Sequence, residues 1–199
     1  NYEDSKRGYA NLMATAKLQP ERRDVVLKLA RRLAASRVRY ETAARSFGCP
    51  WWVVAAVHSL ESGADFSSHL HNGDPLTART VHVPAGRPPY GDPPYSFEAS
   101  ATDALALKGW DKVPSWEVPR CLFELERYNG FGYFGKVRSP YLWSFTNHEQ
   151  PGKYVADHVW DPTARSSQCG AAAILLALIE VGAVTTEPEI NHMSELTNV

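Results

Sequence analysis

Cysteine, an excess of charge of one sign and long apolar runs are all scarce in this 199-residue chain. Its three cysteines, Cys49, Cys121 and Cys169, are far apart, odd in number and outside any C-x-x-C metal pair. Each lies among apolar or small neighbours. We therefore expect buried free thiols, with at most one disulfide, rather than a cysteine metal site.

The charge balance argues against two classes of partner. The chain has 21 Lys and Arg against 22 Asp and Glu, which gives a net charge of −1. Such a chain has no overall field that attracts nucleic acid or an anionic membrane. The longest apolar run, residues 171–184, is interrupted by Glu180 and Gly182 and is shorter than the ~20 residues that a membrane span needs. The sequence therefore predicts no nucleic-acid partner and no membrane span.

Apolar periodicity predicts a mostly α fold. Between residues 26 and 47, apolar side chains recur about every 3.6 positions, which is typical of helices. A second helix is expected at 51–62, with Pro50 at its start and Gly63 at its end. Because it is apolar on nearly every side, it should be central. Further helices are expected at 100–109, 115–130 and 168–183, so the helical core covers about 23–62 and 100–184 of a single domain, 1–199.

Residues 63–98 differ from the rest of the chain. Five prolines occur within residues 84–96, and proline at this density prevents helices and sheet interiors. The stretch "RTVHV" at 79–83 could form a short strand. We expect a long ordered loop or a small β-hairpin inserted into the helical domain, and long loops in small domains are often functional.

Glu61 is the first candidate for chemistry. It lies at the end of the apolar helix, just before a polar loop. Partial burial there would disfavour the ionised carboxylate and raise its pKa. A carboxyl that keeps its proton near neutral pH can protonate a leaving oxygen, as in glycosidic cleavage. The alternative is a structural glutamate that is hydrogen-bonded at a helix end.

Three short motifs resemble the lysozyme-like superfamily, in particular lytic transglycosylases and goose-type lysozymes. They are Glu61-Ser62 at the end of a helix, "RYNG" with Tyr128 and Asn129, and "KYV" with Tyr154, in family order. The resemblance implies a lysozyme-like helical domain that cuts peptidoglycan strands with a single glutamic acid. It also implies that Tyr128 and Asn129 line the glycan groove, and that Tyr154 opens a late helix and orients the acid. The family's Gly-Leu-Met-Gln-like segment is absent, which favours a divergent, phage endolysin-like branch.

Asp74 bears on the type of reaction. Inverting hydrolases need a second carboxylate ~6.5–9.5 Å from the acid to activate water. Asp74 follows Glu61 by thirteen residues, and goose-type lysozymes have an accessory aspartate at a comparable separation. Asp65 and Asp92 are weaker candidates. "NGDP" is equally typical of a turn, so both readings of Asp74, and both hydrolysis and lytic release, stay open.

The histidines suggest a rival class of enzyme. His58 and Glu61 form an H-x-x-E pattern, and His69 and His71 follow. Such a set could bind zinc with a position left open for water, as in a zinc-dependent cell-wall peptidase or amidase. No H-E-x-x-H is present, so groove-lining histidines, His71 among them, are favoured over a metal site.

Aromatic residues are dense after residue 128. Tyr141 and Trp143 are candidates to stack on sugar rings, whereas Phe131 and Phe145 are expected to pack in the core. Stacking platforms also suit single-stranded nucleic acid, but the chain lacks the basic excess that such binding needs.

Together these features predict a muramidase that cleaves the β-1,4 glycosidic bonds of peptidoglycan or a related amino sugar polysaccharide, as a monomer and without a cofactor. A non-catalytic glycan-binding module is the third possibility. The chain starts at Asn1, with no signal peptide in view. The expected location is secreted, periplasmic or wall-associated, or the protein is phage-encoded and acts on the wall.

Overall fold

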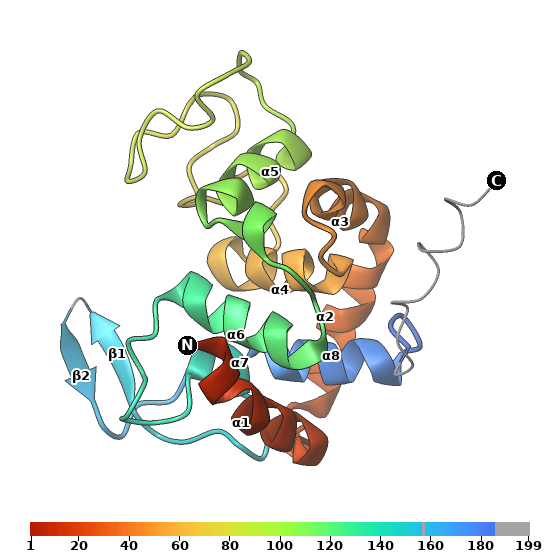
Figure 1. The fold of residues 1–199 in the computed structure, drawn as a ribbon, viewed down its shortest axis with the longest axis vertical. Helices are drawn as coiled ribbons and strands as arrows, with labels where there is room; N and C mark the ends of the chain where they lie inside the picture. The colour runs from red at the N-terminus through yellow and green to blue at the C-terminus, as the bar shows by residue number, and fades with distance from the viewer. Residues whose placement is uncertain (157, 186–199) are drawn as a thin grey trace.

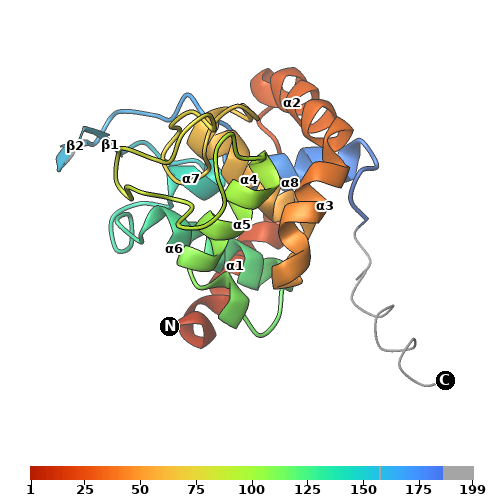
Figure 2. The ribbon, with the colours of Figure 1, turned by 90° about the horizontal axis from the view of Figure 1, so that it is seen from above.

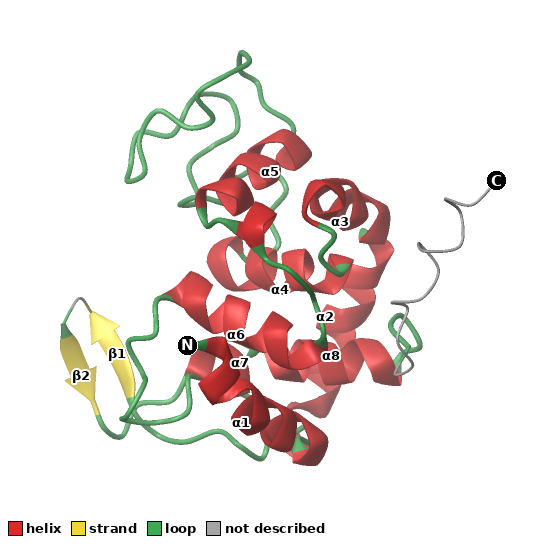
Figure 3. Ribbon diagram, in the orientation of Figure 1, coloured by secondary structure: helices red, strands yellow, loops and turns green. Residues whose placement is uncertain are grey.

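The computed structural model describes residues 1–156 and 158–185, and the described part is mostly helical (Figures 1 and 3). Short 3₁₀ turns, at Pro20–Arg22, Arg45–Phe47 and Trp110–Lys112, join several of the helices. The α-helices of the described residues are α1 (Tyr2–Thr15), α2 (Arg23–Ala35), α3 (Arg37–Ala44), α4 (Trp51–Ser62), α5 (Phe97–Leu107), α6 (Val118–Asn129), α7 (Pro140–Trp143) and α8 (Ala171–Glu180). The predicted fold class, mostly α, is confirmed.

Helix α4 is the centre of the core, as its apolar sequence predicted. Every residue from Trp51 to His58 is buried, and the helix packs against α3, α6 and α8. Pro50 has extended backbone and precedes the first turn. Gly63 ends the helix in the left-handed region at φ +62°, where its N–H bonds to the carbonyls of the last turn. The C-terminal end of α4 is therefore held both by its backbone hydrogen bonds and by the packing of the helix.

Helix α1 is an element that the sequence reading did not predict. The side chain of Asn1 caps it by accepting a hydrogen bond from the N–H of Asp4, at 3.2 Å. Only Tyr2 and Tyr9 are buried, and both rings meet Phe123 of α6 edge-on. Because only these two side chains of α1 are buried, the sequence of this helix has no clear apolar periodicity from which it could be predicted.

Residues 63–96 form a long loop, which lies above α5 at the top of Figure 1. The loop is held by its own backbone: the N–H of His69 donates to the carbonyl of Asp74 at 2.7 Å, and the N–H of Tyr95 donates to Leu76 at 2.8 Å. The described loop contains an isolated bridge between Ser68 and Pro75 but no strand. The expected strand at 79–83 is therefore wrong, since the backbone there turns to bond within the loop.

The two short strands of the described residues lie elsewhere, in an antiparallel hairpin of β1 (Lys153–Ala156) and β2 (Val159–Asp161). Tyr154 pairs with Trp160 across the hairpin. In Figures 1 and 2 the hairpin projects to one side of the helices. The expectation that Tyr154 opens a late helix is wrong, because β-branched and aromatic side chains in "KYV" and "VWD" favour cross-strand pairing.

Two further expectations concern the cysteines and the membrane. Cys49, Cys121 and Cys169 are all buried and free in the described part of the chain. Across the described ranges, no helix is both long enough and apolar enough to cross a bilayer. The apolar segment near the C-terminus forms α8, whose first five residues are all buried in the core.

Candidate active site

Glu61 is the next-to-last residue of α4, and its side chain leaves the core at the end of that helix. Its Oε1 accepts a hydrogen bond from the hydroxyl of Tyr141 at 2.9 Å. The residue is solvent-accessible, yet protein atoms surround the carboxyl closely enough that desolvation raises its pKa. The Tyr141 hydrogen bond and the charge of Lys108 act in the opposite direction but do not cancel this effect. A carboxyl in this setting keeps its proton to higher pH than an ordinary glutamate.

Tyr141 is placed by α7, a single turn that starts at Pro140 and packs against α6 and α8. Burial, followed by the charge of Glu61, raises the pKa of the Tyr141 hydroxyl well above its ordinary value. The hydroxyl therefore stays protonated and serves as a hydrogen-bond donor to Glu61. The sequence marked Tyr141 as a sugar-stacking candidate, and the structure places it beside the acid.

Tyr128 and Lys108 complete the surroundings of the carboxyl. Tyr128 is buried in α6, and its hydroxyl donates to the carbonyl of Leu70 at 3.3 Å. Lys108 donates to the carbonyl of Tyr128 at 3.0 Å and lies 4.4 Å from the centre of its ring. Burial, followed by the charge of Glu61, raises the pKa of Tyr128. Sequence reasoning missed Lys108, which stands at the end of α5 with only the following Gly109 as a signal.

Tyr154 and Asn129 are not placed against the acid by any contact in the described residues. The hydroxyl of Tyr154 accepts a hydrogen bond from Lys136, and its ring meets Trp160 at 5.2 Å between ring centres. Asn129 is exposed and ends α6. The resemblance implied that Tyr154 orients Glu61, but the tyrosine that hydrogen-bonds Glu61 in this structure is Tyr141.

Asp74 is a structural anchor of the loop. Its Oδ2 accepts from the backbone N–H groups of Val81 and His82, at 2.8 and 3.0 Å, and its Oδ1 lies 2.5 Å from the His82 ring. The side-chain hydrogen bond from His82 is the largest cause that lowers the pKa of Asp74 to about 2. A carboxylate with three donors and such a low pKa is a weak base. These contacts match the turn that "NGDP" suggested.

The zinc alternative requires His58, Glu61 and His69 or His71 to converge, and the structure separates them. His58 is fully buried between Phe66 and Phe97, with its Nδ1 3.0 Å from the Tyr40 hydroxyl. Burial lowers its pKa to about 4. No three His, Cys, Asp or Glu side chains are grouped to hold a metal ion within residues 1–156 and 158–185.

The other two histidines belong to a buried network that ties the loop to α5. His69 Nδ1 lies 2.7 Å from the Ser100 hydroxyl, and its Nε2 donates to the Ala78 carbonyl at 2.8 Å. His71 Nε2 donates to Asp103 at 2.8 Å. Arg87 donates to both oxygens of Asp103, at 2.9 and 2.5 Å. This arrangement places His71 inside the protein, where it does not line a groove.

Trp143 is buried, with 2% of its surface exposed, and its ring meets His148 edge-on. A buried ring cannot stack on a sugar, so the expectation for Trp143 is wrong. It follows from the helical turn of α7, which points Tyr141 and Trp143 in different directions. Phe145 is buried, as expected, whereas Phe131 is only partly buried.

Comparisons with known proteins add no assignment. No family model, no curated protein and no solved structure matches this chain.

Proposed function

We propose that this protein cleaves the β-1,4 glycosidic bonds of peptidoglycan, or of a related amino sugar polysaccharide, with Glu61 as the general acid. The observation that carries the proposal is the environment of the Glu61 carboxyl. It is rigidly positioned by a buried helix, desolvated enough to raise its pKa, and oriented by the Tyr141 hydroxyl. The resemblance of "ES" and "RYNG" to lysozyme-like enzymes supports the substrate class.

In the first step, protonated Glu61 donates its proton to the glycosidic oxygen, and the bond from that oxygen to the anomeric carbon breaks. Positive charge develops on the sugar ring while Glu61 becomes a carboxylate. The Tyr141 hydrogen bond and the Lys108 charge both favour that carboxylate. They stabilise the acid after it has lost its proton, and desolvation keeps the proton in place before the reaction.

The second step determines the product. Asp74 already accepts three hydrogen bonds, and its low pKa makes it a poor base for activating water. This supports a mechanism with a single carboxylate, in which a hydroxyl of the sugar itself attacks the anomeric carbon. The Glu61 carboxylate then takes up the proton of that hydroxyl, and the product carries an anhydro end.

The position of the substrate follows from the same residues. Glycan would lie across the ends of α4 and α6, where it can contact Asn129, with Tyr128 behind it as part of the wall. Action on a wall polymer places the protein outside the cytoplasm or in a phage-encoded lysis system. A single chain supplies every residue that this mechanism uses.

The test of the general acid is Glu61→Gln, which keeps the shape of the side chain and removes its proton. Turbidity clearing of purified cell walls should fall by about 10²–10⁴-fold, while thermal unfolding is unchanged. Glu21→Gln is the matched control, since Glu21 is exposed in the 3₁₀ turn before α2. Clearing that persists in Glu61→Gln contradicts the assignment.

Mass spectrometry of the released fragments tests the second step. Anhydro ends are expected, reducing ends would indicate hydrolysis, and freed peptides without cut glycan would overturn the glycosidase proposal. Binding of glycan without any product would favour the non-catalytic module.

A further inference from the structure

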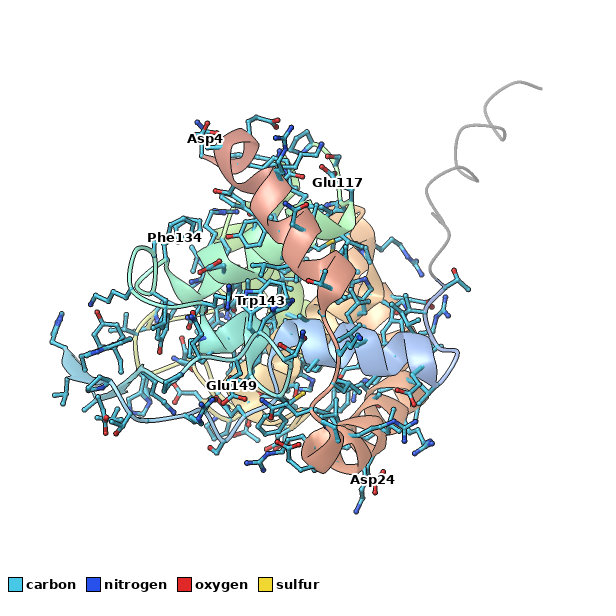
Figure 4. All side chains as sticks on the ribbon, turned by 90° about the horizontal axis from the view of Figure 1, so that it is seen from below. Asp4, Asp24, Glu117, Phe134, Trp143 and Glu149 are labelled. Atoms are coloured by element: carbon cyan, nitrogen blue, oxygen red, sulfur yellow. The ribbon has the colours of Figure 1, made fainter. Side chains whose placement is uncertain are left out.

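A cavity of about 480 Å³ lies between α1, α6, α7 and the segment 134–139. Figure 4 views the molecule from this side, with α1 in front and Phe134 and Trp143 labelled beside it. Neither Glu61 nor Tyr141 lines the cavity. Its volume lies in the range of small-molecule sites, ~300–1,000 Å³.

Gly8 of α1 forms part of the cavity wall. A Cβ atom placed on Gly8 would meet nothing within 4 Å. The backbone of Gly8 is not in the left-handed region, so its conformation does not require glycine. A glycine inside a helix costs about 1 kcal/mol relative to alanine. A larger side chain at this position would extend into open space, so Gly8 is the place at which the cavity can be filled.

One buried polar atom in the wall, the Oγ of Ser139, lacks a partner, and one carboxylate oxygen of Glu126 in the same wall is unpaired in the described residues. Glu126 of α6 is 7% exposed, and its Oε2 accepts from the Tyr9 hydroxyl at 2.6 Å. Its Oε1 has no hydrogen-bond partner within the described residues, and burial raises its pKa. The Oγ of Ser139, in a residue that is 2% exposed, also has no partner there. Buried polar groups are nearly always hydrogen-bonded, so the Ser139 hydroxyl is unusual, and it and the unpaired Glu126 oxygen are both available to a ligand in the cavity.

The rest of the lining defines the kind of ligand. Most of the wall is apolar or aromatic, from Leu12, Phe134 and Val137 among others. Arg138 adds a cation at an exposed position, and no carboxylate pairs with it in the described residues. The ligand should therefore have an apolar body, nitrogen–hydrogen donors for Glu126 and Ser139, and a negative group for Arg138.

We propose that this cavity binds a short peptide with apolar side chains and a free carboxyl terminus. Its amino or amide groups donate to Glu126 Oε1 and Ser139 Oγ, its side chains contact the apolar wall, and its carboxylate pairs with Arg138. The site is separate from Glu61 and does not depend on the proposed glycosidase activity.

The test is an NMR titration of the full chain with alanyl-leucyl-alanine, in free, N-acetylated and C-amidated forms. The free peptide should cause saturable shifts of the Gly8 amide and the Trp143 indole N–H. Amidation should weaken binding severalfold in the wild type and have little effect in Arg138→Ala. Acetylation should weaken binding severalfold in the wild type and less in Glu126→Gln.

Gly8→Leu fills the cavity and should lower the affinity at least tenfold without lowering the melting temperature, since leucine favours helix over glycine. Asn11→Leu, on an exposed position of α1 outside the cavity, is the control and should bind normally. Glu61→Gln should also bind normally, which separates this result from the glycosidase test. The absence of saturable shifts with all three peptides, or unchanged binding in Gly8→Leu, overturns the proposal.

Discussion

The carboxyl group at the end of α4 and those of the loop network after it differ in their hydrogen bonding. Glu61 has one hydrogen-bond donor, Tyr141, and a raised pKa. Asp74 has three donors and a pKa of about 2, and Asp103 is held by both Arg87 and His71. Asp74 and Asp103 each accept several hydrogen bonds, whereas Glu61 accepts one. Hydrogen-bond saturation therefore separates the structural carboxylates from the candidate acid.

Removing a carboxylate that accepts several hydrogen bonds should have the largest effect on stability. Asp103→Ala removes the buried carboxylate that pairs with Arg87 and leaves the Arg87 charge without its ionic partner. We therefore expect a loss of about 3–5 kcal/mol in the free energy of unfolding. Urea unfolding measures it. Asp92→Ala, in an exposed part of the same loop, is the control and should be close to neutral. Equal stability of the two variants would mean that the network does not hold the loop.

His58 extends the comparison to the buried side of α4. Its pKa is about 4 instead of the ordinary 6.5, because burial disfavours the charged ring. The unfolded chain therefore takes up this proton first, and stability is lost as the pH falls from 6.5 to 4, by up to about 3 kcal/mol. Urea unfolding at pH 7 and pH 4 should show a smaller difference in His58→Phe. The same difference in both proteins contradicts the buried neutral histidine.

The partner of the acid can be tested by comparing two tyrosines. Tyr141→Phe removes a hydrogen bond that lowers the pKa of Glu61. The pKa should rise, so the decline of activity at high pH should move to higher pH, and the rate should fall by about fivefold, or ~1 kcal/mol. Tyr154→Phe should leave the position of this decline unchanged, since the Tyr154 hydroxyl contacts Lys136. If only Tyr154→Phe shifts the decline of activity at high pH, then Tyr154, and not Tyr141, orients Glu61.

Asp74→Asn should have the smallest effect on cleavage, less than about tenfold, because this carboxylate serves the loop in the proposed mechanism. Its effect should appear in stability instead. The lowered pKa means that Asp74 stabilises the fold above its ordinary value of 3.8 and loses this effect as the pH falls toward 2. Wild type and variant should differ in urea unfolding at pH 7 and converge near pH 2. A loss of cleavage comparable to that of Glu61→Gln would identify Asp74 as the catalytic base.

The central helix and Glu61 could be predicted from sequence because their signals are local. Pro50, an apolar run and Gly63 define α4 within fourteen residues. The partners of Glu61 could not be predicted in the same way, since Lys108 and Tyr141 reach it from 47 and 80 residues further along the chain. The order of the motifs predicted that the tyrosine beside Glu61 is Tyr154 of "KYV". The pairing of Tyr154 with Trp160 instead places that side chain in the β1–β2 hairpin.

The histidine-rich loop shows the same limit. The spacing of His58, His69 and His71 suggests convergence on a metal, but each ring finds a separate partner: Tyr40, Ser100 and Asp103. These partners lie on other helices, α3 and α5. Residue types near one another in sequence therefore gave the correct polarity of the loop and the wrong geometry.

The burial of α4 on nearly every side also has a kinetic consequence. Amide hydrogens in such a helix exchange with solvent only when the whole core opens, whereas those of exposed loops exchange through local fluctuations. The backbone that carries Glu61 should thus be among the slowest to exchange in the chain, and the loop tip near Val83 among the fastest. The backbone that carries the Glu61 carboxyl should therefore keep its position through fluctuations that leave the core closed.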